Sequence, residues 1–495
     1  MYYYSTNHTA ARATLRDAVV RGLAEDRGLY MPEVIKQLPA SFWDEMAEMS
    51  FQDVAYRVAD AFFGEDVEAD ALRKIVNDTL AFDCPIVKVE DNIYALELFH
   101  GPTLAFKDVG ARFMARLLQW TLSPLSRKGE GLASLDSCAQ PLPSLTGGVG
   151  GGSEVNVLVA TSGDTGSAVA NGFLGVEGIH VYVLYPKGKV SPIQECQFTT
   201  LGQNITAIEV DGVFDDCQAL VKSAFMDKEL NAHMRLTSAN SINVARFLPQ
   251  AFYYFWAYAQ LKKGPSPVRA GNEETPADSQ SPLPNRGGAG EGAVVFCVPS
   301  GNFGNICSAL FGHVMGLPVK RFIAANNANS VFYEYLQSGE YRPRPSVQTI
   351  ANAMDVGDPS NFARILDLYN REDVINIIGF NVLPTQNIKS NFISGATYSD
   401  AQIAETMRDC YARTGYILDP HGACGYRALK EQLQPDEIGI FLETAHPAKF
   451  KDTVDRILDI DLPIPEKLQA FMRGTKQSVP MTKCFEDFKA YLMQQ

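Results

Sequence analysis

One lysine of the sequence stands where a helix is predicted to begin. Residues 100–108 read HGPTLAFKD, and their Gly-Pro pair breaks the preceding element, after which apolar residues recur at helical spacing from Phe106 to Trp120. Lys107 therefore falls in the first turn of this helix, where the helix dipole disfavours an ammonium group and favours a neutral amine. A neutral lysine amine is a nucleophile toward aldehydes. The other interpretation, which this stretch alone favours, is a surface lysine paired with Asp108.

A glycine-rich loop further along the chain is suited to binding a phosphate group. Residues 300–305 read SGNFGN and lie between a predicted buried strand, residues 293–298, and a helix predicted from Ile306. Gly301 and Gly304 lack the side chains that would block a close backbone approach, and the free N–H groups of such a loop favour an anion. The patterns of Walker A and dinucleotide-binding loops are both missing. An ordinary tight turn between strand and helix is equally compatible with these residues.

A second loop of the same kind carries additional hydroxyl groups. Residues 161–166 read TSGDTG, after a strand predicted at 155–161 and before a helix predicted from Ser167. We expect one hydroxyl among Ser162, Thr165 and Ser167 to cap the helix. The remaining hydroxyls indicate a second anion site, for a carboxylate or a phosphate.

Two further motifs carry polar groups next to predicted elements. Residues 240–246 read NSINVAR and open another helix, and capping is favoured over substrate contact for their side chains. Thr444 follows a short apolar strand, so its hydroxyl is expected at the carboxyl end of that strand, where it can meet a ring nitrogen of a bound cofactor. His446 is interpreted as a turn residue before Pro447.

The elements around these motifs predict an α/β protein. Strand, glycine turn and helix follow one another repeatedly, and the strands are apolar without alternation, which is typical of parallel sheets covered on both faces. Ligands of such folds lie beyond the carboxyl ends of the strands. Residues 1–95 are predicted to be mainly helical. Two low-complexity stretches, at about 123–153 and 264–292, are predicted to be surface insertions because they cannot bury enough apolar surface to offset chain entropy.

Composition limits the class of protein and its partners. The 495 residues are 46% hydrophobic and carry a formal charge of −14, which argues against nucleic acid or an anionic membrane as a general partner. No run approaches the ~20 apolar residues of a membrane span, and no secretory signal is visible at the N-terminus. The nine cysteines are scattered and the seven histidines show no metal-binding spacing. We therefore expect reduced thiols, no metal and a cytoplasmic location.

Taken in order, the motifs resemble those of the threonine synthase family of pyridoxal-phosphate enzymes, in its microbial and fungal branch. The resemblance spans nearly the whole chain and includes YST at 4–6, GLAEDRGLYMP at 22–32, LDPHG at 418–422 and ETAHPAKF at 443–450. It implies the tryptophan-synthase-β-like fold (fold type II), with two parallel-sheet α/β domains. The domains expected are a mainly helical segment at 1–95, a smaller domain with TSGDTG at 96–246 and a larger cofactor-binding domain at 247–495.

The resemblance also implies roles for single residues. Lys107 corresponds to the catalytic lysine that binds pyridoxal 5'-phosphate as a Schiff base, and Thr444 to the residue that faces the pyridine nitrogen. The cofactor-phosphate loop corresponds to Gly301, Asn302, Phe303, Gly304 and Asn305. The substrate-binding residues implied are Thr103, Ser162, Asp164, Thr165, Ser167 and Asn243. The plant-like branch has asparagine at the position of Asp164.

The reaction implied is the conversion of O-phospho-L-homoserine and water to L-threonine and phosphate, by a monomer or a homodimer. Two alternatives stay open at this point. One is a phospho-lyase of the same fold that releases 2-oxobutanoate, ammonia and phosphate. The other is a non-catalytic binding protein that has kept the fold, which the intact Lys107 and the intact phosphate loop disfavour.

Overall fold

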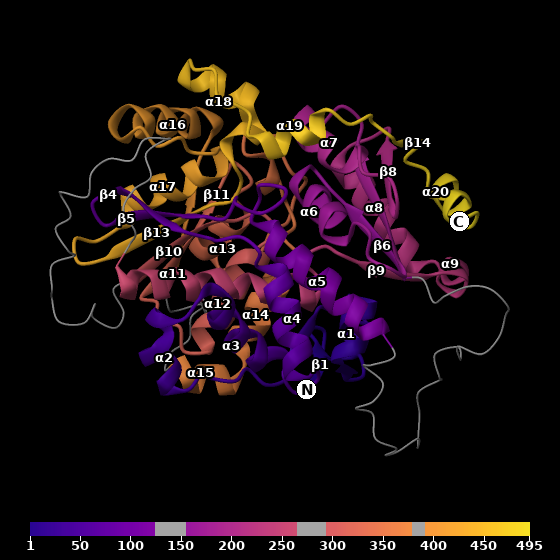
Figure 1. Cartoon of the computed structure of the whole chain (residues 1–495), viewed down its shortest axis with the longest axis horizontal. Coiled ribbons are helices and arrows are strands. Elements are labelled where there is room, and N and C mark those ends of the chain that lie inside the picture. The colour runs from indigo at the N-terminus through magenta and orange to yellow at the C-terminus, as the bar shows by residue number, and fades with distance from the viewer. Residues whose placement is uncertain (124–154, 265–293, 379–391) are drawn as a thin grey trace.

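The computed structural model of the protein describes residues 1–123, 155–264, 294–378 and 392–495. These residues form two sheets of mainly parallel strands flanked by helices, and a small antiparallel sheet near the N-terminus (Figure 1). The predicted α/β class with parallel sheets is thereby confirmed. The two predicted insertions lie almost entirely outside the described residues. No helix within the described residues is long and apolar enough to cross a membrane.

The larger sheet has six strands in the order β12-β11-β10-β13-β5-β4. Neighbouring strands are parallel, except that β4 and β5 form an antiparallel pair. Every residue of the central strand β10 is buried, as expected for a strand covered by helices on both faces. The strands are β4 (Ile86–Glu90), β5 (Ile93–Glu97), β10 (Val294–Pro299), β11 (Arg321–Asn326), β12 (Ile393–Thr397) and β13 (Ile438–Glu443).

The smaller sheet has five strands, all parallel, in the order β14-β8-β7-β6-β9. Its central strands are buried, and the expected strand before TSGDTG is present as β6. The strands are β6 (Val155–Ala160), β7 (Ile179–Pro186), β8 (Ile205–Val210), β9 (Arg235–Ser238) and β14 (Val479–Met481).

Helices cover both sheets. Figure 1 shows α16 and α17 on one face of the larger sheet and α11 and α12 on the other. The helices are α1 (Leu15–Arg21), α2 (Ala40–Glu45), α3 (Phe51–Phe63), α4 (Ala69–Thr79), α5 (Lys107–Leu122), α6 (Asp164–Phe173), α7 (Pro192–Thr199), α8 (Phe214–Met226), α9 (Lys228–His233), α10 (Val244–Phe247), α11 (Phe252–Lys263), α12 (Gly304–Val314), α13 (Val331–Ser338), α14 (Phe362–Asn370), α15 (Glu372–Ile378), α16 (Asp400–Thr414), α17 (Pro420–Gln432), α18 (Lys451–Leu458), α19 (Glu466–Met472) and α20 (Phe485–Leu492).

The N-terminal region contains the predicted helices and a sheet that the prediction missed. The strands β1 (Tyr2–Ser5), β2 (Ala13–Thr14) and β3 (Tyr30–Pro32) pair antiparallel. They are too short to show the alternation of apolar and polar residues by which a strand is recognised. Helix α3 packs against α11, and α4 packs against α5. The apolar faces of these N-terminal helices are therefore buried against the rest of the protein.

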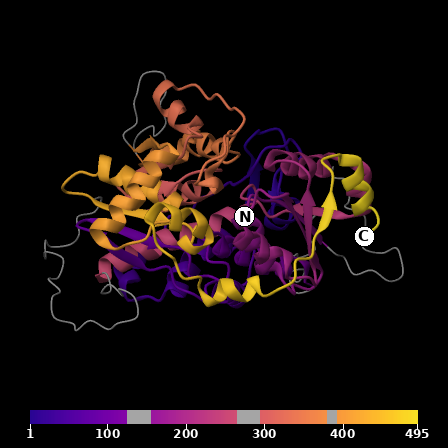
Figure 2. The ribbon, with the colours of Figure 1, turned by 90° about the horizontal axis from the view of Figure 1, so that it is seen from above.

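Sheet membership differs from the predicted domain boundaries at two places. Strands β4 and β5 belong to the six-stranded sheet, although residues 86–95 were expected in the N-terminal segment. Strand β14 joins the five-stranded sheet and α20 packs on α8, although both were expected in the larger domain (Figure 2). A division into consecutive segments misses these exchanges because tertiary pairing, not chain order, decides which sheet a strand joins. The division into domains remains a prediction.

Candidate active site

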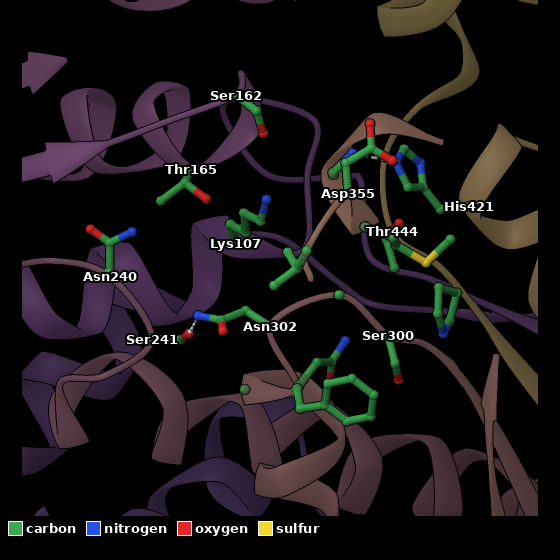
Figure 3. Close-up of a pocket in the computed structure, with 18 of the residues that line it drawn as sticks. Lys107, Ser162, Thr165, Asn240, Ser241, Ser300, Asn302, Asp355, His421 and Thr444 are labelled. Carbon is green, nitrogen blue, oxygen red and sulfur yellow. Dashed lines mark hydrogen bonds between the residues drawn. The ribbon is translucent and has the colours of Figure 1, made fainter. Parts of the chain in front are cut away.

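The candidate site is a cavity lined by residues that follow strands of both parallel sheets and by the start of α5. Figure 3 shows Lys107 among its lining residues, with Ser162 and Thr165 on one side and His421 and Thr444 on the other. The carboxyl ends of strands from both sheets thus meet at one place, as expected for ligand sites of parallel sheets.

Lys107 is the first residue of α5 and lines the cavity. The surrounding protein lowers its pKa to about 8 through desolvation, and the nearby cations Arg246 and Lys449 act in the same direction, against the opposing effect of Asp164. No carboxylate of the described residues forms an ion pair with Lys107. A substantial share of its amine is therefore neutral near pH 7 to 8, as a nucleophile requires.

Asp108 does not pair with Lys107, contrary to the surface-lysine interpretation. Its carboxylate accepts hydrogen bonds from the backbone N–H of Thr103, at 2.9 Å, and from the Thr103 hydroxyl, at 2.6 Å. Glycine is required at position 101 because a Cβ atom there would lie 2.3 Å from Asp108 Oδ2. Asp108 thus folds the Gly-Pro-Thr turn against the start of α5. The Thr103 side chain is fully buried in this contact and does not line the cavity.

The loop between β10 and α12 lines the cavity with all five residues that were predicted to hold the cofactor phosphate, from 301 to 305. The helix begins at Gly304, earlier than predicted, so its first N–H groups belong to the loop. Phe303 adopts the left-handed conformation, with φ of 61°. A Cβ atom on Gly301 would lie 2.8 Å from the Cα atom of Met354, which explains the glycine at this close approach. Asn302 is oriented by donating to the Ser241 hydroxyl over 3.1 Å (Figure 3).

Two residues of the cavity wall each carry a buried donor group that lacks a partner among the described residues. The Asn305 side-chain oxygen accepts from the hydroxyls of Tyr253 and Tyr254, both at 2.7 Å, while its Nδ2 group has no acceptor. Arg246 donates through Nε to the Ala239 carbonyl, at 3.2 Å, but its Nη1 group is unpaired, and no carboxylate in the described part of the chain forms an ion pair with it. Buried donors without partners are costly and call for an explanation. Arg246 and the first N–H groups of α12 belong to the cavity wall, so the cavity fits an anionic group such as the phosphate of pyridoxal phosphate.

Thr444 follows β13 and lines the cavity beside the start of α5. Its carbonyl oxygen accepts from the N–H of Phe106 at 2.8 Å, and Ala105 and Ala445 form an antiparallel bridge. The backbone around Thr444 is thereby hydrogen-bonded to the segment that precedes Lys107.

The TSGDTG loop contributes two of its side chains to the cavity, Ser162 and Thr165. The capping hydroxyl belongs to Thr161, which accepts from the N–H groups of Gly163 and Gly166 at 2.9 and 2.8 Å. This differs from the prediction, in which one of the later hydroxyls is the cap. Helix α6 begins at Asp164 rather than at Ser167.

Four predicted substrate residues are absent from the cavity wall: Thr103, Asp164, Ser167 and Asn243. The Ser167 hydroxyl contacts the carbonyls of Gly163 and Gln194, and Asp164 forms an ion pair with Lys449. Asn243 caps α10 by accepting from the Ala245 N–H at 3.0 Å, and donates to the Val19 carbonyl at 2.8 Å. These polar groups are already engaged within the protein.

His421 and Asp355 line the same cavity, and the sequence patterns assigned neither of them a role. His421 Nε2 accepts from the Ala353 N–H at 3.1 Å, so its proton is on Nδ1, which lies 2.6 Å from Asp419 Oδ1. Burial raises the pKa of Asp355 to about 6. Only the LDPHG motif could have indicated a site role for His421. No sequence pattern around Asp355 indicated such a role.

Comparisons with known proteins are consistent with this geometry along the whole chain. Models of three protein families match: threonine synthase N terminus at residues 2–80, pyridoxal-phosphate dependent enzyme at residues 78–442, and threonine synthase, C-terminal at residues 422–491. Threonine synthase of Haemophilus influenzae is 40% identical over 493 residues, which cover 100% of both chains.

Two crystal structures show a similar fold. That of threonine synthase from Escherichia coli has a TM-score of 0.82 at 36% identity and covers 100% of both chains. That of threonine synthase from Brucella melitensis with bound pyridoxal phosphate has a TM-score of 0.82 at 31% identity, covering 100% of this chain and 99% of the other.

Proposed function

The chain belongs to the threonine synthase family of pyridoxal-phosphate enzymes, and from this premise we propose that it converts O-phospho-L-homoserine and water to L-threonine and phosphate in the cavity around Lys107. Family membership makes it a lyase that uses pyridoxal phosphate. The observation that carries the proposal is the position of Lys107, a buried amine with a lowered pKa that lines the same cavity as the glycine loop of residues 301–305.

The residues that would hold the cofactor surround this lysine. We assign the cofactor phosphate to the loop of residues 301–305, the pyridine nitrogen to the Thr444 hydroxyl and the covalent attachment to Lys107. Pyridoxal phosphate, when bound, supplies an electron sink that makes the substrate carbons acidic. The start of α12 at Gly304 supports the phosphate assignment, because the first N–H groups of a helix have no acceptor within it.

Lys107 is proposed to be the acid and base of the reaction. An amine with a pKa of about 8 can accept a proton from the substrate Cα and return it later at the pH of a cell. The amine is released next to the carbon that it must reach once the substrate amine has displaced it from the cofactor.

Ser162 and Thr165 are proposed to bind the substrate phosphate, since they are the predicted substrate residues that line the cavity. They follow β6 of the five-stranded sheet, Ser162 just before α6 and Thr165 in its first turn, whereas the cofactor loop and Thr444 follow strands of the six-stranded sheet. A substrate phosphate bound between them would draw the two parts together and exclude water from the reacting carbons.

Product analysis tests the proposed reaction. The holoenzyme is incubated with O-phospho-L-homoserine, and amino acids, oxo acids and phosphate are quantified. Equal amounts of threonine and phosphate are expected. Release of 2-oxobutanoate and ammonia would instead identify a phospho-lyase, and a protein that binds the substrate without turnover would be a non-catalytic member of the fold.

Location and assembly are part of the proposal. We place the enzyme in the cytoplasm, as a monomer or a homodimer. Fractionation of cells and light scattering of the purified protein test these two statements independently of the chemistry.

A further inference from the structure

A buried ion pair lies next to the candidate site and outside its wall. Lys449 Nζ is 2.6 Å from Asp164 Oδ1, and the two side chains are 0% and 3% exposed. Lys449 belongs to the short 3-10 turn Pro447–Phe450 that follows β13, and Asp164 is the first residue of α6, which follows β6. The pair therefore connects loops that follow strands of different sheets.

Both partners make additional hydrogen bonds. Lys449 donates to the Thr103 carbonyl at 2.9 Å, on the turn that precedes Lys107. Asp164 accepts from Gln194 Nε2 at 2.9 Å. Although burial acts in the opposite direction, Lys449 and Lys107 hold the pKa of Asp164 well below its usual range, so its carboxylate is ionised. A buried carboxylate needs a cation nearby, and among the described residues Asp164 forms its ion pair with Lys449 and not with Lys107.

The charges around Lys107 come from several elements. Asp164 on α6 favours its ammonium form, whereas Arg246 on α10 and Lys449 disfavour it. On α5 itself, Asp108 is occupied by Thr103. Asp355 and His421 line the same cavity and lie on the side of Thr444 (Figure 3). Among these groups, Asp164 is the carboxylate that favours the ammonium form of Lys107, and Asp164 is itself ion-paired with Lys449.

We propose that Lys449 is a positioning residue that engages Asp164 and so prevents this carboxylate from pairing with Lys107. Lys107 then stays available to bind the cofactor and to exchange it for the substrate amine. The inference rests on the proposed role of Lys107. If the Lys449–Asp164 pair had only a structural role, it would stabilise the contact between the two loops without changing the protonation of the Lys107 nitrogen.

The test is a pH titration of the visible absorption of the cofactor in the holoenzyme, which follows protonation of the Lys107 nitrogen bound to it. The midpoint of this titration is compared among wild type, K449M, D164N and K449M/D164N. K449M leaves Asp164 without its cation, so the midpoint should rise by about one pH unit. D164N removes the anion and should lower the midpoint. The double variant removes both opposing charges and should titrate near the wild type. K449R keeps the charge and should also resemble the wild type.

Lys451 provides a matched control, because it forms ion pairs with Asp455 and Asp461 at the surface. K451M should leave the midpoint unchanged. Midpoints of K449M and D164N that both coincide with the wild type would overturn the proposal. If K449M does not fold, a D164N midpoint at or above that of the wild type overturns it. Borohydride reduction of the wild type separates the two claims: a label on another lysine refutes the role of Lys107, whereas a label on Lys107 with unmoved midpoints refutes only the role of Lys449.

Discussion

The backbone N–H of Phe106 donates a 2.8 Å hydrogen bond to the carbonyl oxygen of Thr444. This bond connects the residue before Lys107 to the residue at the carboxyl end of β13. Lys107 and Thr444, which are proposed to contact different atoms of the cofactor, are thus positioned relative to each other by a backbone hydrogen bond. Substitution of either side chain leaves this bond intact.

The first prediction concerns the Thr444 hydroxyl. T444V keeps the backbone bond and the side-chain shape but removes the contact to the ring nitrogen. Loss of one hydrogen bond between neutral groups should weaken cofactor binding about threefold to tenfold. Equilibrium dialysis with pyridoxal phosphate measures this change. T444S retains the hydroxyl and should bind like the wild type, so equal weakening by both substitutions would refute the contact.

The second prediction concerns Thr103, whose side chain is not part of the cavity wall. T103V removes the hydroxyl that donates to Asp108 and leaves a buried carboxylate oxygen without that partner. The free energy of unfolding should fall by about 1–3 kcal/mol, as measured by urea denaturation. KM for the substrate should change by less than about twofold, because no substrate contact is lost. A large rise in KM at unchanged stability would instead support a direct contact between Thr103 and the substrate.

The third prediction concerns Thr165, whose side chain does line the cavity. T165V keeps the shape and removes one donor to the substrate phosphate. Catalytic efficiency should fall by about tenfold to a hundredfold, as measured by steady-state kinetics, with cofactor binding unchanged. Loss of pyridoxal phosphate from T165V would assign this loop to the cofactor instead.

The fourth prediction concerns the pH dependence of cofactor capture. The neutral fraction of the Lys107 amine rises about tenfold per pH unit below its pKa. The rate at which the apoenzyme takes up pyridoxal phosphate should therefore rise with pH to about 8 and then level off. Stopped-flow absorbance measures the rate. A rate that still rises at pH of about 10 would indicate an ordinary, solvated lysine.

The chemistry of the site could be predicted where a local signal exists. The Gly-Pro break before an apolar helical pattern placed Lys107 at a helix start, and the helix does begin at this residue. The glycines of residues 300–305 marked a loop between strand and helix, and that loop lines the cavity. Each of these signals lies within a few residues of the feature that it predicts.

Tertiary contacts could not be predicted in the same way. Thr165 and Ser167 are both polar and lie close together in sequence, but only Thr165 faces the cavity because the helix turns between them. The partners of Thr103 and Asp164 depend on how the loops fold against each other. The pairing of β14 with β8 likewise joins distant parts of the chain, so no local sequence pattern predicts it.

The central claim is that Lys107 binds the cofactor, and borohydride reduction followed by peptide mapping tests it most directly. Borohydride fixes pyridoxal phosphate to the lysine that carries it. The labelled peptide should contain Lys107, and K107A should yield no labelled peptide. A label on Lys449, the buried lysine nearby, or on any other lysine would contradict the assignment.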